Sequence, residues 1–149
     1  MPGFYFEDFE IGQAFVTAGR TVTEADIVAF AGLSGDFNSI HTNAEFARTT
    51  PYGQRIAHAV LGIAFVTGLT ARLGIFDGTA VEFVGMDWRF VAPILIGDTV
   101  HCEITIAAKE EGARPDRGAL VREIRLLKHD GTVAQTGTST MMVLRRPST

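Results

Sequence analysis

An acid, an amide and an imidazole stand within six residues of one another in the segment Ser34–His41. Asp36, Asn38 and His41 are the residue types that bind a water molecule and move its protons. Asp36 and His41 are five positions apart, which is about 16 Å along an extended chain and about 7.5 Å along a helix. Both must come within roughly 3 Å of one water to act together. We therefore expect a bend, which Gly35 and Asn38 tolerate.

The same residues also have ordinary explanations. An Asp that follows Gly and precedes Asn often forms only an Asx turn, and a single His is commonly an unremarkable polar residue. The segment by itself therefore leaves both catalysis and turn formation open.

A second candidate site lies at His58-Ala59, at the start of a predicted buried helix. The first N–H groups of a helix have no partner within it and lie at the positive end of its dipole, so they suit a developing oxyanion. Most helix N-termini bind only water or a capping group. Asp36, His41 and His58 could be imagined as metal ligands, but no His-x-x-x-His or carboxylate cluster accompanies them, and we predict no metal site.

Helical signals fill the first half of the chain and must position these residues. A helix begins after the N-cap Thr23 and stops at Gly35, which places the segment Ser34–His41 in the loop that follows. A brief helical turn starts at Asn43. The third helix runs from about Ala57 to Leu73 and is apolar almost all round, as helices inside a protein are.

After Gly78 the period of the hydrophobic pattern becomes two, which is typical of half-buried antiparallel strands. In the first of these strands we expect the alternate apolar residues from Val84 to Phe90 to share the buried face. The predicted strands contain Val84–Phe90, Val100–Ile106, Leu120–Leu126 and Val133–Leu144, with an early strand around Phe15–Thr21. A long apolar helix and an antiparallel sheet able to wrap around it predict an α+β architecture of the hot-dog type.

Composition narrows the class of protein. The chain has 149 residues, 46% of them hydrophobic, and a formal net charge of −4 with scattered basic residues, so we expect no binding to nucleic acid or to a membrane. Cys102 is the single cysteine, which excludes an intramolecular disulfide, and we predict that it is a small buried hydrophobe. We find no linker, transmembrane stretch or secretory signal, and predict one cytoplasmic domain over residues 1–149.

Longer stretches of the chain resemble one family. The run Ser34–His41, followed by Phe46-Ala47, resembles the hydratase-2 signature of the MaoC-like dehydratases and (R)-specific enoyl-CoA hydratases. Further similar segments are Phe6–Gly12, Val22–Ile27, Tyr52–His58 and Phe90–Asp98. The resemblance spans nearly the whole chain.

This resemblance implies a hot-dog fold, a homodimer or higher homo-oligomer, and reversible syn hydration of a trans-2-enoyl thioester to an (R)-3-hydroxyacyl thioester. Asp36 and His41 would activate one water, and Asn38 and Gly35 would support them. The backbone N–H of Ala59 would contact the thioester oxygen. The resemblance implies no metal or redox cofactor, because the coenzyme A or acyl-carrier-protein arm is part of the substrate.

Three positions depart from the family pattern. Ser39 stands where Pro is usual, and Ala59 where Gly is common. Ala64 occupies a position where several members carry a small hydroxyl residue that supports the catalytic His. If this chain is a hydratase, that support must come from another group.

Two other functions stay open at this point. An acyl-CoA thioesterase of the same fold tends to place an acid on or beside its central helix, and Ala57–Leu73 contains none. A non-catalytic acyl-thioester-binding module is the other alternative, which the departures at Ala59 and Ala64 keep open. The presence of both Asp36 and His41 favours the hydratase, because binding alone needs neither.

Overall fold

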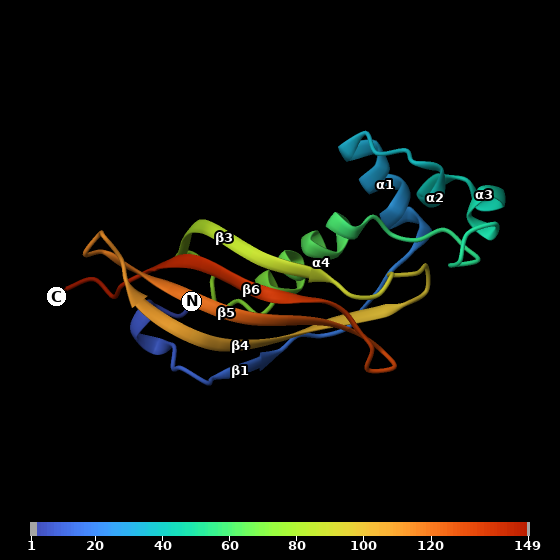
Figure 1. Cartoon of the computed structure of the whole chain (residues 1–149). Helices are drawn as coiled ribbons and strands as arrows, with labels where there is room; N and C mark the ends of the chain where they lie inside the picture. Colours follow the sequence, from blue (N-terminus) through green and yellow to red (C-terminus); the bar gives the residue numbers. More distant parts are fainter. Residues whose placement is uncertain (1–2, 149) are drawn as a thin grey trace.

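The structure is a computed structural model that describes residues 3–148. The chain begins with a short helical turn and two short strands, which are followed by four helices and four long strands (Figure 1). In chain order they are η1 (Phe6–Asp8), β1 (Ala14–Val16), β2 (Arg20–Thr21), α1 (Glu24–Ser34), α2 (Ser39–Thr42), α3 (Ala44–Arg48), α4 (Ala59–Ala71), β3 (Ala80–Phe90), β4 (Thr99–Glu111), β5 (Arg117–Lys128) and β6 (Val133–Leu144).

The strands form one antiparallel sheet in the order β1-β4-β5-β6-β3, with β2 also paired to β4. The sheet curves along α4, which lies against one of its faces (Figure 1). This arrangement confirms the predicted α+β hot-dog fold.

The core forms where α4 meets the concave face of the sheet. Leu61, Phe65 and Leu69 of α4 are buried with Ile104 of β4 in one apolar cluster. Cys102 belongs to the same cluster and is fully buried, and this burial raises the pKa of its thiol to about 12. The prediction that Cys102 is a buried hydrophobe is therefore confirmed.

The early strand is divided, where the sequence predicted one strand over Phe15–Thr21. Its two parts, β1 and β2, both pair with β4. Between them the Thr17 hydroxyl accepts a hydrogen bond from the backbone N–H of Cys102 at 2.9 Å. A side chain thus replaces a backbone group in the ladder, which ends the regular pairing of β1.

The predicted burial of β3 is wrong at two positions. Val84 is 56% exposed and Phe90 is 52% exposed. The pairing of β3 with β6 shifts its register between Phe83 and Gly85, so Val84 is the extra residue of a bulge. Phe90 stays in register with the half-buried Met86 and Trp88, but it is the last residue of the strand. β3 is also an edge strand, and within residues 3–148 one of its sides pairs with no other strand.

Helices α1, α2 and α3 gather at one end of the molecule, beyond the N-terminus of α4 (Figure 1). The segment between α1 and α2 is therefore brought to the start of the buried helix, although more than twenty residues separate them in sequence. None of the helices within residues 3–148 is long and apolar enough to cross a membrane.

Candidate active site

Local hydrogen bonds turn the chain sharply between α1 and α2. Gly35 ends α1 with φ +78°, a left-handed conformation that glycine adopts without strain. The Ser34 hydroxyl accepts from the N–H of Asp36 at 3.1 Å, and Asp36 Oδ1 accepts from the N–H of Asn38 at 3.1 Å. The Asn38 side chain then caps α2 by accepting from the N–H of Ile40 at 3.3 Å. Gly35 and Asn38 thus lie at the bend that the sequence predicts.

His41 lies in the single helical turn α2, and the predicted loop is wrong at this point. The N–H of His41 donates to the carbonyl of Asn38 at 2.9 Å, and the N–H of Asn43 donates to Ser39 at 2.9 Å. Ser39 is the first residue of α2, where Pro is also favoured because the N–H there needs no helical partner. The turn therefore forms with Ser39 in place of Pro.

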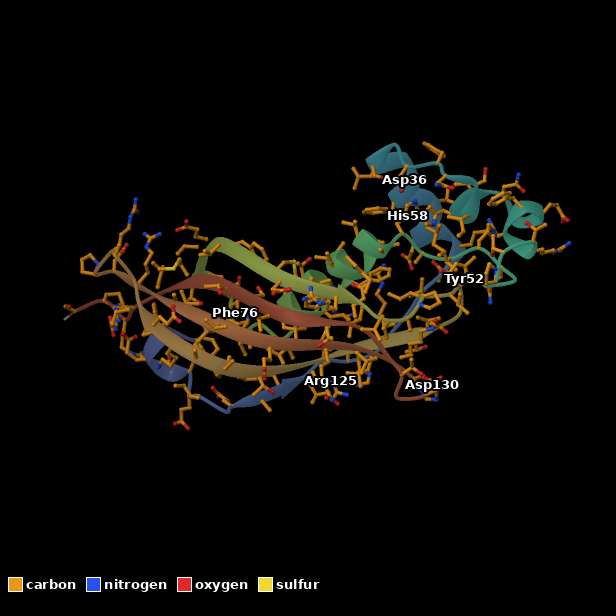
Figure 2. The ribbon with its side chains drawn as sticks, viewed as in Figure 1. Asp36, Tyr52, His58, Phe76, Arg125 and Asp130 are labelled. Atoms are coloured by element: carbon orange, nitrogen blue, oxygen red, sulfur yellow. The ribbon has the colours of Figure 1, made fainter. Side chains whose placement is uncertain are left out.

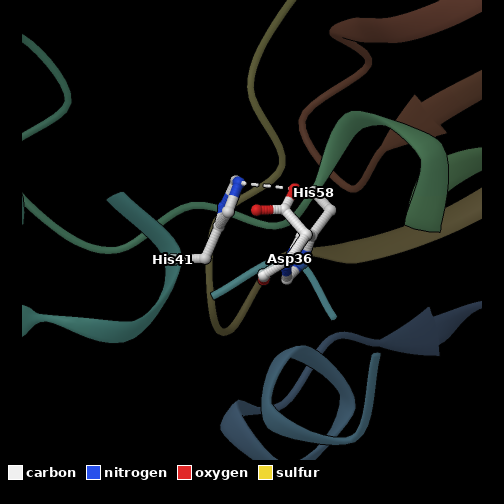
Figure 3. Close-up of side chains that lie close together, drawn as sticks. All are labelled: Asp36, His41 and His58. Carbon is white, nitrogen blue, oxygen red and sulfur yellow. Dashed lines mark hydrogen bonds and ion pairs between the residues drawn. The ribbon is translucent and has the colours of Figure 1, made fainter. Parts of the chain in front are cut away.

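The Asp36 carboxylate and the His41 ring face one another (Figure 3). His41 Nε2 lies 3.9 Å from Asp36 Oδ2. This distance is too long for a direct hydrogen bond, and it allows one water to contact both atoms. The His41 side chain is 11% exposed and that of Asp36 is 51% exposed, so the pair lies between the protein interior and solvent.

A backbone carbonyl fixes the His41 ring. Nδ1 of His41 lies 2.8 Å from the carbonyl oxygen of Ile56, which can only accept, so Nδ1 carries the proton. In the neutral ring Nε2 is then free to accept a proton on the side that faces Asp36. The Ile56 carbonyl thus supports the His41 ring, for which the sequence predicted a group other than Ala64.

His58 connects the two parts of the site. It is the N-cap of α4, and its Nε2–H donates to the carbonyl oxygen of Asp36 at 2.8 Å. Its ring stacks on that of His41, with centroids 3.8 Å apart and planes at 24°. Phe30 contacts the His58 ring at a centroid distance of 4.9 Å. His58 therefore holds both the Asp36 backbone and the His41 ring in place.

The geometry of the histidines does not suit a metal ion. One ligand atom from each of Asp36, His41 and His58 lies within 4.8 Å of the others. However, the lone pair of an imidazole nitrogen lies in the plane of its ring, and the rings of His41 and His58 are stacked and nearly parallel. Their lone pairs therefore do not converge on one point, which tetrahedral or octahedral coordination requires.

Ala59 is the first residue of α4 and lines the same cleft as Asp36 and His41. Its N–H has no partner within the helix and lies at the positive end of the helix dipole. Its carbonyl oxygen accepts a hydrogen bond from Nε2 of Gln135 at 2.9 Å. The structure thus brings Ala59 to the same site as Asp36 and His41.

The cleft around these groups has a volume of about 600 Å³. Its polar groups gather near the start of α4, where Figure 2 shows Asp36 and His58 close together. Most of the remaining wall is apolar and comes from the connection after β3, from α1 and from the loop before α4. The lining includes Phe30, Tyr52, Ile56, Val60 and Phe90–Ile94. A site of this kind can bind an apolar chain beside a pair of proton-transfer groups.

Sequence reasoning missed the positioning contacts of His58 and the presence of Gln135 in the cleft. The position of His58 at a predicted helix start was visible, but its hydrogen bond to Asp36 depends on how the chain folds back. Gln135 lies on β6, 76 residues after Ala59. No local pattern connects residues that far apart.

The chain is similar to known proteins over most of its length. Residues 8–124 match the model of the MaoC like domain. The chain is 41% identical over 103 residues to the (R)-specific enoyl-CoA hydratase of Rhodospirillum rubrum, which covers 68% of this chain and 69% of that protein. It is 35% identical over 104 residues to the 3-hydroxybutyryl-CoA dehydratase of Methylorubrum extorquens, covering 69% and 64% of the two proteins.

A solved structure gives the same relationship. The MaoC-like dehydratase from Rhodospirillum rubrum aligns with a TM-score of 0.86 and 29% identity, over 98% of this chain and 100% of that chain. The family predicted from the motif is therefore confirmed by sequence and by fold. This chain belongs to the MaoC-like dehydratase family.

Proposed function

We propose that this protein is an (R)-specific enoyl-CoA hydratase, or 3-hydroxyacyl-thioester dehydratase, that adds water reversibly to a trans-2-enoyl thioester. The observation that carries the proposal is the pair of Asp36 and His41, whose facing atoms lie 3.9 Å apart at the polar end of an apolar cleft. The relatives named above are hydratases and dehydratases, and they confirm the predicted hydro-lyase class.

The pair activates one water for addition to the double bond. Asp36 Oδ2 and the unprotonated Nε2 of His41 both contact this water, and one of them takes a proton as the oxygen bonds to C3. The same pair returns a proton to C2, so the elements of one water are added and nothing else is consumed. Because both groups lie on one side of the cleft, oxygen and proton reach the same face of the double bond, as syn addition requires.

The start of α4 stabilises the intermediate. As hydroxide adds to C3, negative charge moves to the thioester oxygen. The Ala59 N–H is a donor fixed by the helix, and the helix dipole adds to its effect. The methyl group of Ala59 stands beside this position and narrows the space for the thioester compared with glycine.

The substrate supplies the rest of the chemistry. A trans-2-enoyl group is already activated by conjugation with its thioester, so the proposal needs no metal or redox cofactor. The apolar cleft suits an acyl chain, and coenzyme A or an acyl-carrier protein provides the arm that enters with it. A cytoplasmic location fits such a substrate and remains a prediction.

A homodimer is part of the same proposal. β3 is an edge strand with an unpaired side, and it carries the exposed apolar residues Val81, Phe83 and Val84. A long apolar edge strand is usually covered by another chain. Light scattering during gel filtration should give about twice the mass of one 16.1 kDa chain, whereas the mass of a single chain would contradict the dimer.

One assay tests the proposed activity against its alternatives. Crotonyl-CoA is incubated with the protein while the ultraviolet absorbance of the conjugated thioester and the release of free thiol are followed together. We expect the absorbance to fall without thiol release, and chiral chromatography of the product to give (R)-3-hydroxybutyryl-CoA. Thiol release would indicate a thioesterase, and no change with several chain lengths would indicate a binding module.

A further inference from the structure

A second cavity, of about 400 Å³, lies beside the C-terminal half of α4. Most of its wall is apolar, with Phe76, Phe83 and Met141 among the lining residues. In Figure 2 Phe76 lies toward the opposite end of the molecule from Asp36 and His58. The proposed hydration chemistry therefore uses no residue of this cavity.

Arg122 of β5 is a buried cation on the wall of this cavity. It is only 5% exposed, and no carboxylate within residues 3–148 lies within 4 Å of it. Its Nη2 donates to the hydroxyl of Ser139 at 3.0 Å, while its Nε is buried without an acceptor in the described part of the chain. Its guanidinium lies 5.2 Å from the centre of the Phe76 ring. Burial lowers its pKa to about 10, so it is still charged at neutral pH.

A buried charge without a partner is unfavourable, and proteins usually pair it or replace it. Thr70 of α4 lines the same cavity, and its hydroxyl is also buried without a partner in the described residues. Asp77 is the acidic residue of the lining, but it is exposed and makes no ion pair with Arg122. Two polar groups beside one cavity thus lack an acceptor among the described residues, and an anionic ligand would supply one.

The cavity continues the line of the catalytic cleft. Ala59 and Val60 of α4 line the cleft, and Ile63, Val66 and Thr70 line the cavity. Ala59, Ile63, Val66 and Thr70 are three or four residues apart and share one face of the helix. The face extends from Ala59 to Thr70 over about 16 Å at the usual helical rise of 1.5 Å per residue.

β6 repeats this arrangement on the opposite wall. Gln135 lines the cleft, and Ser139 and Met141 line the cavity. They are separated by even numbers of residues and so lie on one face of the strand. Within the cleft, the Gln135 side chain is bonded to Ala59 and to Trp88.

We infer that Arg122 binds a carboxylate at the far end of the substrate's acyl chain, and that the substrate class is the ω-carboxy enoyl thioesters. This inference rests on the proposed function. A carboxylate accepts two parallel hydrogen bonds from a guanidinium, and its remaining lone pairs suit the hydroxyls of Thr70 and Ser139. A chain that ends in a methyl group leaves these donors unsatisfied, and sites built for a hydrogen bond select strongly against such analogues.

A binding measurement tests Arg122 without any catalysis. The probes are octanoate and the uncharged octanamide, titrated into the full-length protein in a calorimeter. We expect octanoate to bind at least tenfold more tightly than octanamide, about the effect of one hydrogen bond to a charged group. Arg122→Met should abolish this preference. Equal binding of both probes, no binding of octanoate, or a preference that survives in Arg122→Met would overturn the inference.

Arg125→Met is the matched control, because Arg125 lies on the same strand but is exposed and paired with Glu103 at 3.0 Å. It should keep the wild-type preference for octanoate. If Arg122→Met does not fold, Ser139→Ala replaces it, since Ser139 accepts from Nη2 of Arg122. Ser139→Ala should weaken octanoate binding severalfold and leave octanamide unchanged, and an unchanged octanoate affinity would count against the inference.

A kinetic comparison separates this inference from the proposed function. The substrates are 2-octenedioyl-CoA and 2-octenoyl-CoA, which differ only in the terminal carboxylate. We expect kcat/KM to be at least tenfold higher for the first, through a lower KM, and Arg122→Met to bring the two values together. Equal turnover of both by the wild type would overturn the role of Arg122 and keep the hydratase. Turnover of neither would overturn the hydratase, and the octanoate titration then decides on Arg122 alone.

Discussion

Different kinds of side chain lie at the two ends of α4. At its start, three side chains of the cleft each make at least one hydrogen bond: Asp36 accepts from Asn38, His41 donates to Ile56, and His58 donates to the carbonyl of Asp36. Beside its C-terminal half, Arg122 is almost fully buried and lacks a carboxylate partner in the described residues.

Solvent accounts for the contrast. Asp36, which exchanges protons with water in the proposed mechanism, is half exposed, whereas Arg122 is almost fully buried, where its charge interacts more strongly with any ligand. One helix face therefore serves two purposes. It presents fixed proton-transfer groups at one end and an incompletely satisfied cation further along.

The largest expected effect comes from removing the proton-transfer groups. Asp36→Asn and His41→Ala should each lower kcat about a thousandfold, within the range of general acid–base catalysis. The double variant should lose little more, because the two groups act on the same water. Steady-state hydration of crotonyl-CoA measures this, with melting temperatures to confirm folding.

Glu45→Gln serves as the control for Asp36→Asn, because Glu45 is an exposed acid nine residues further along, paired only with Arg48 at the surface. It should keep wild-type turnover. A double variant whose loss is the product of the two single losses would show that Asp36 and His41 act independently. The cleft would then not work as a pair around one water.

A smaller effect is expected at His58, which positions the pair without touching the water. His58→Phe keeps an aromatic ring against His41 but removes the hydrogen bond to the Asp36 carbonyl. We expect kcat to fall about 10- to 100-fold with KM unchanged, as small displacements of catalytic groups do. Kinetics of crotonyl-CoA hydration separate the two constants.

The same substitution should not destabilise the fold. Nδ1 of His58 is buried without a partner in residues 3–148, and phenylalanine removes this unsatisfied atom. A melting temperature well below that of the wild type would make His58 a structural residue, because the lower rate would then reflect less folded protein. His58→Ala loses both the stacking and the hydrogen bond and should lower kcat further.

Part of this site could be predicted from the sequence because it is local. Gly35, Asp36, Asn38 and His41 lie within seven residues, and their types set the bend and the chemistry. The turn α2 was not predicted because it has only four residues and depends on one cap, the side chain of Asn38. Helix propensity is a weak predictor for so short an element.

The fold followed from periodicity, but the second cavity did not. The apolar helix and the alternating strands predicted the hot-dog sheet, while the bulge at Val84 and the strand end at Phe90 departed from the alternation in β3. Arg122 shares the period-two face of Leu120, Ile124 and Leu126, so the alternation already indicates a buried position. Nothing local in the sequence shows that a cavity lies beside it.

The packing of α4 against β6 beside the cleft gives a third prediction, at Gly62. A Cβ at this position would clash with Nε2 of Gln135, whose side chain is held by hydrogen bonds to Ala59 and Trp88. Gly62→Ala should therefore destabilise the protein by about 1–3 kcal/mol, as overpacking does. Gly68→Ala is the matched control, because nothing lies within 4 Å of its Cβ position.

In the middle of a helix, glycine costs about 0.5–1 kcal/mol relative to alanine, so Gly68→Ala should stabilise the fold by that amount. Urea unfolding of both variants measures the difference. If Gly62→Ala is as stable as the wild type, Gln135 moves aside freely and is not held tightly against α4.

The smallest expected effect concerns Cys102 and measures whether water reaches the core next to Arg122. Cys102 is close enough to Arg122 for their charges to interact, and burial raises the pKa of its thiol to about 12 from an ordinary value of 9.0. The folded state therefore keeps a proton that the unfolded chain loses between these values. The stability linked to Cys102 is complete below pH 9 and is lost as pH rises toward 12.

Reaction with a thiol reagent reads the same property near neutral pH. Because the thiolate is the reactive form, the native protein at pH 8 should react no faster than it unfolds, while one thiol per chain should react at once in urea. The Cys102→Ala variant has no thiol and gives the background signal of the reagent. Rapid labelling of the native chain would mean that water reaches the core beside Arg122, and the strong, selective binding of a carboxylate there would lose its physical basis, since that strength depends on a site from which water is excluded.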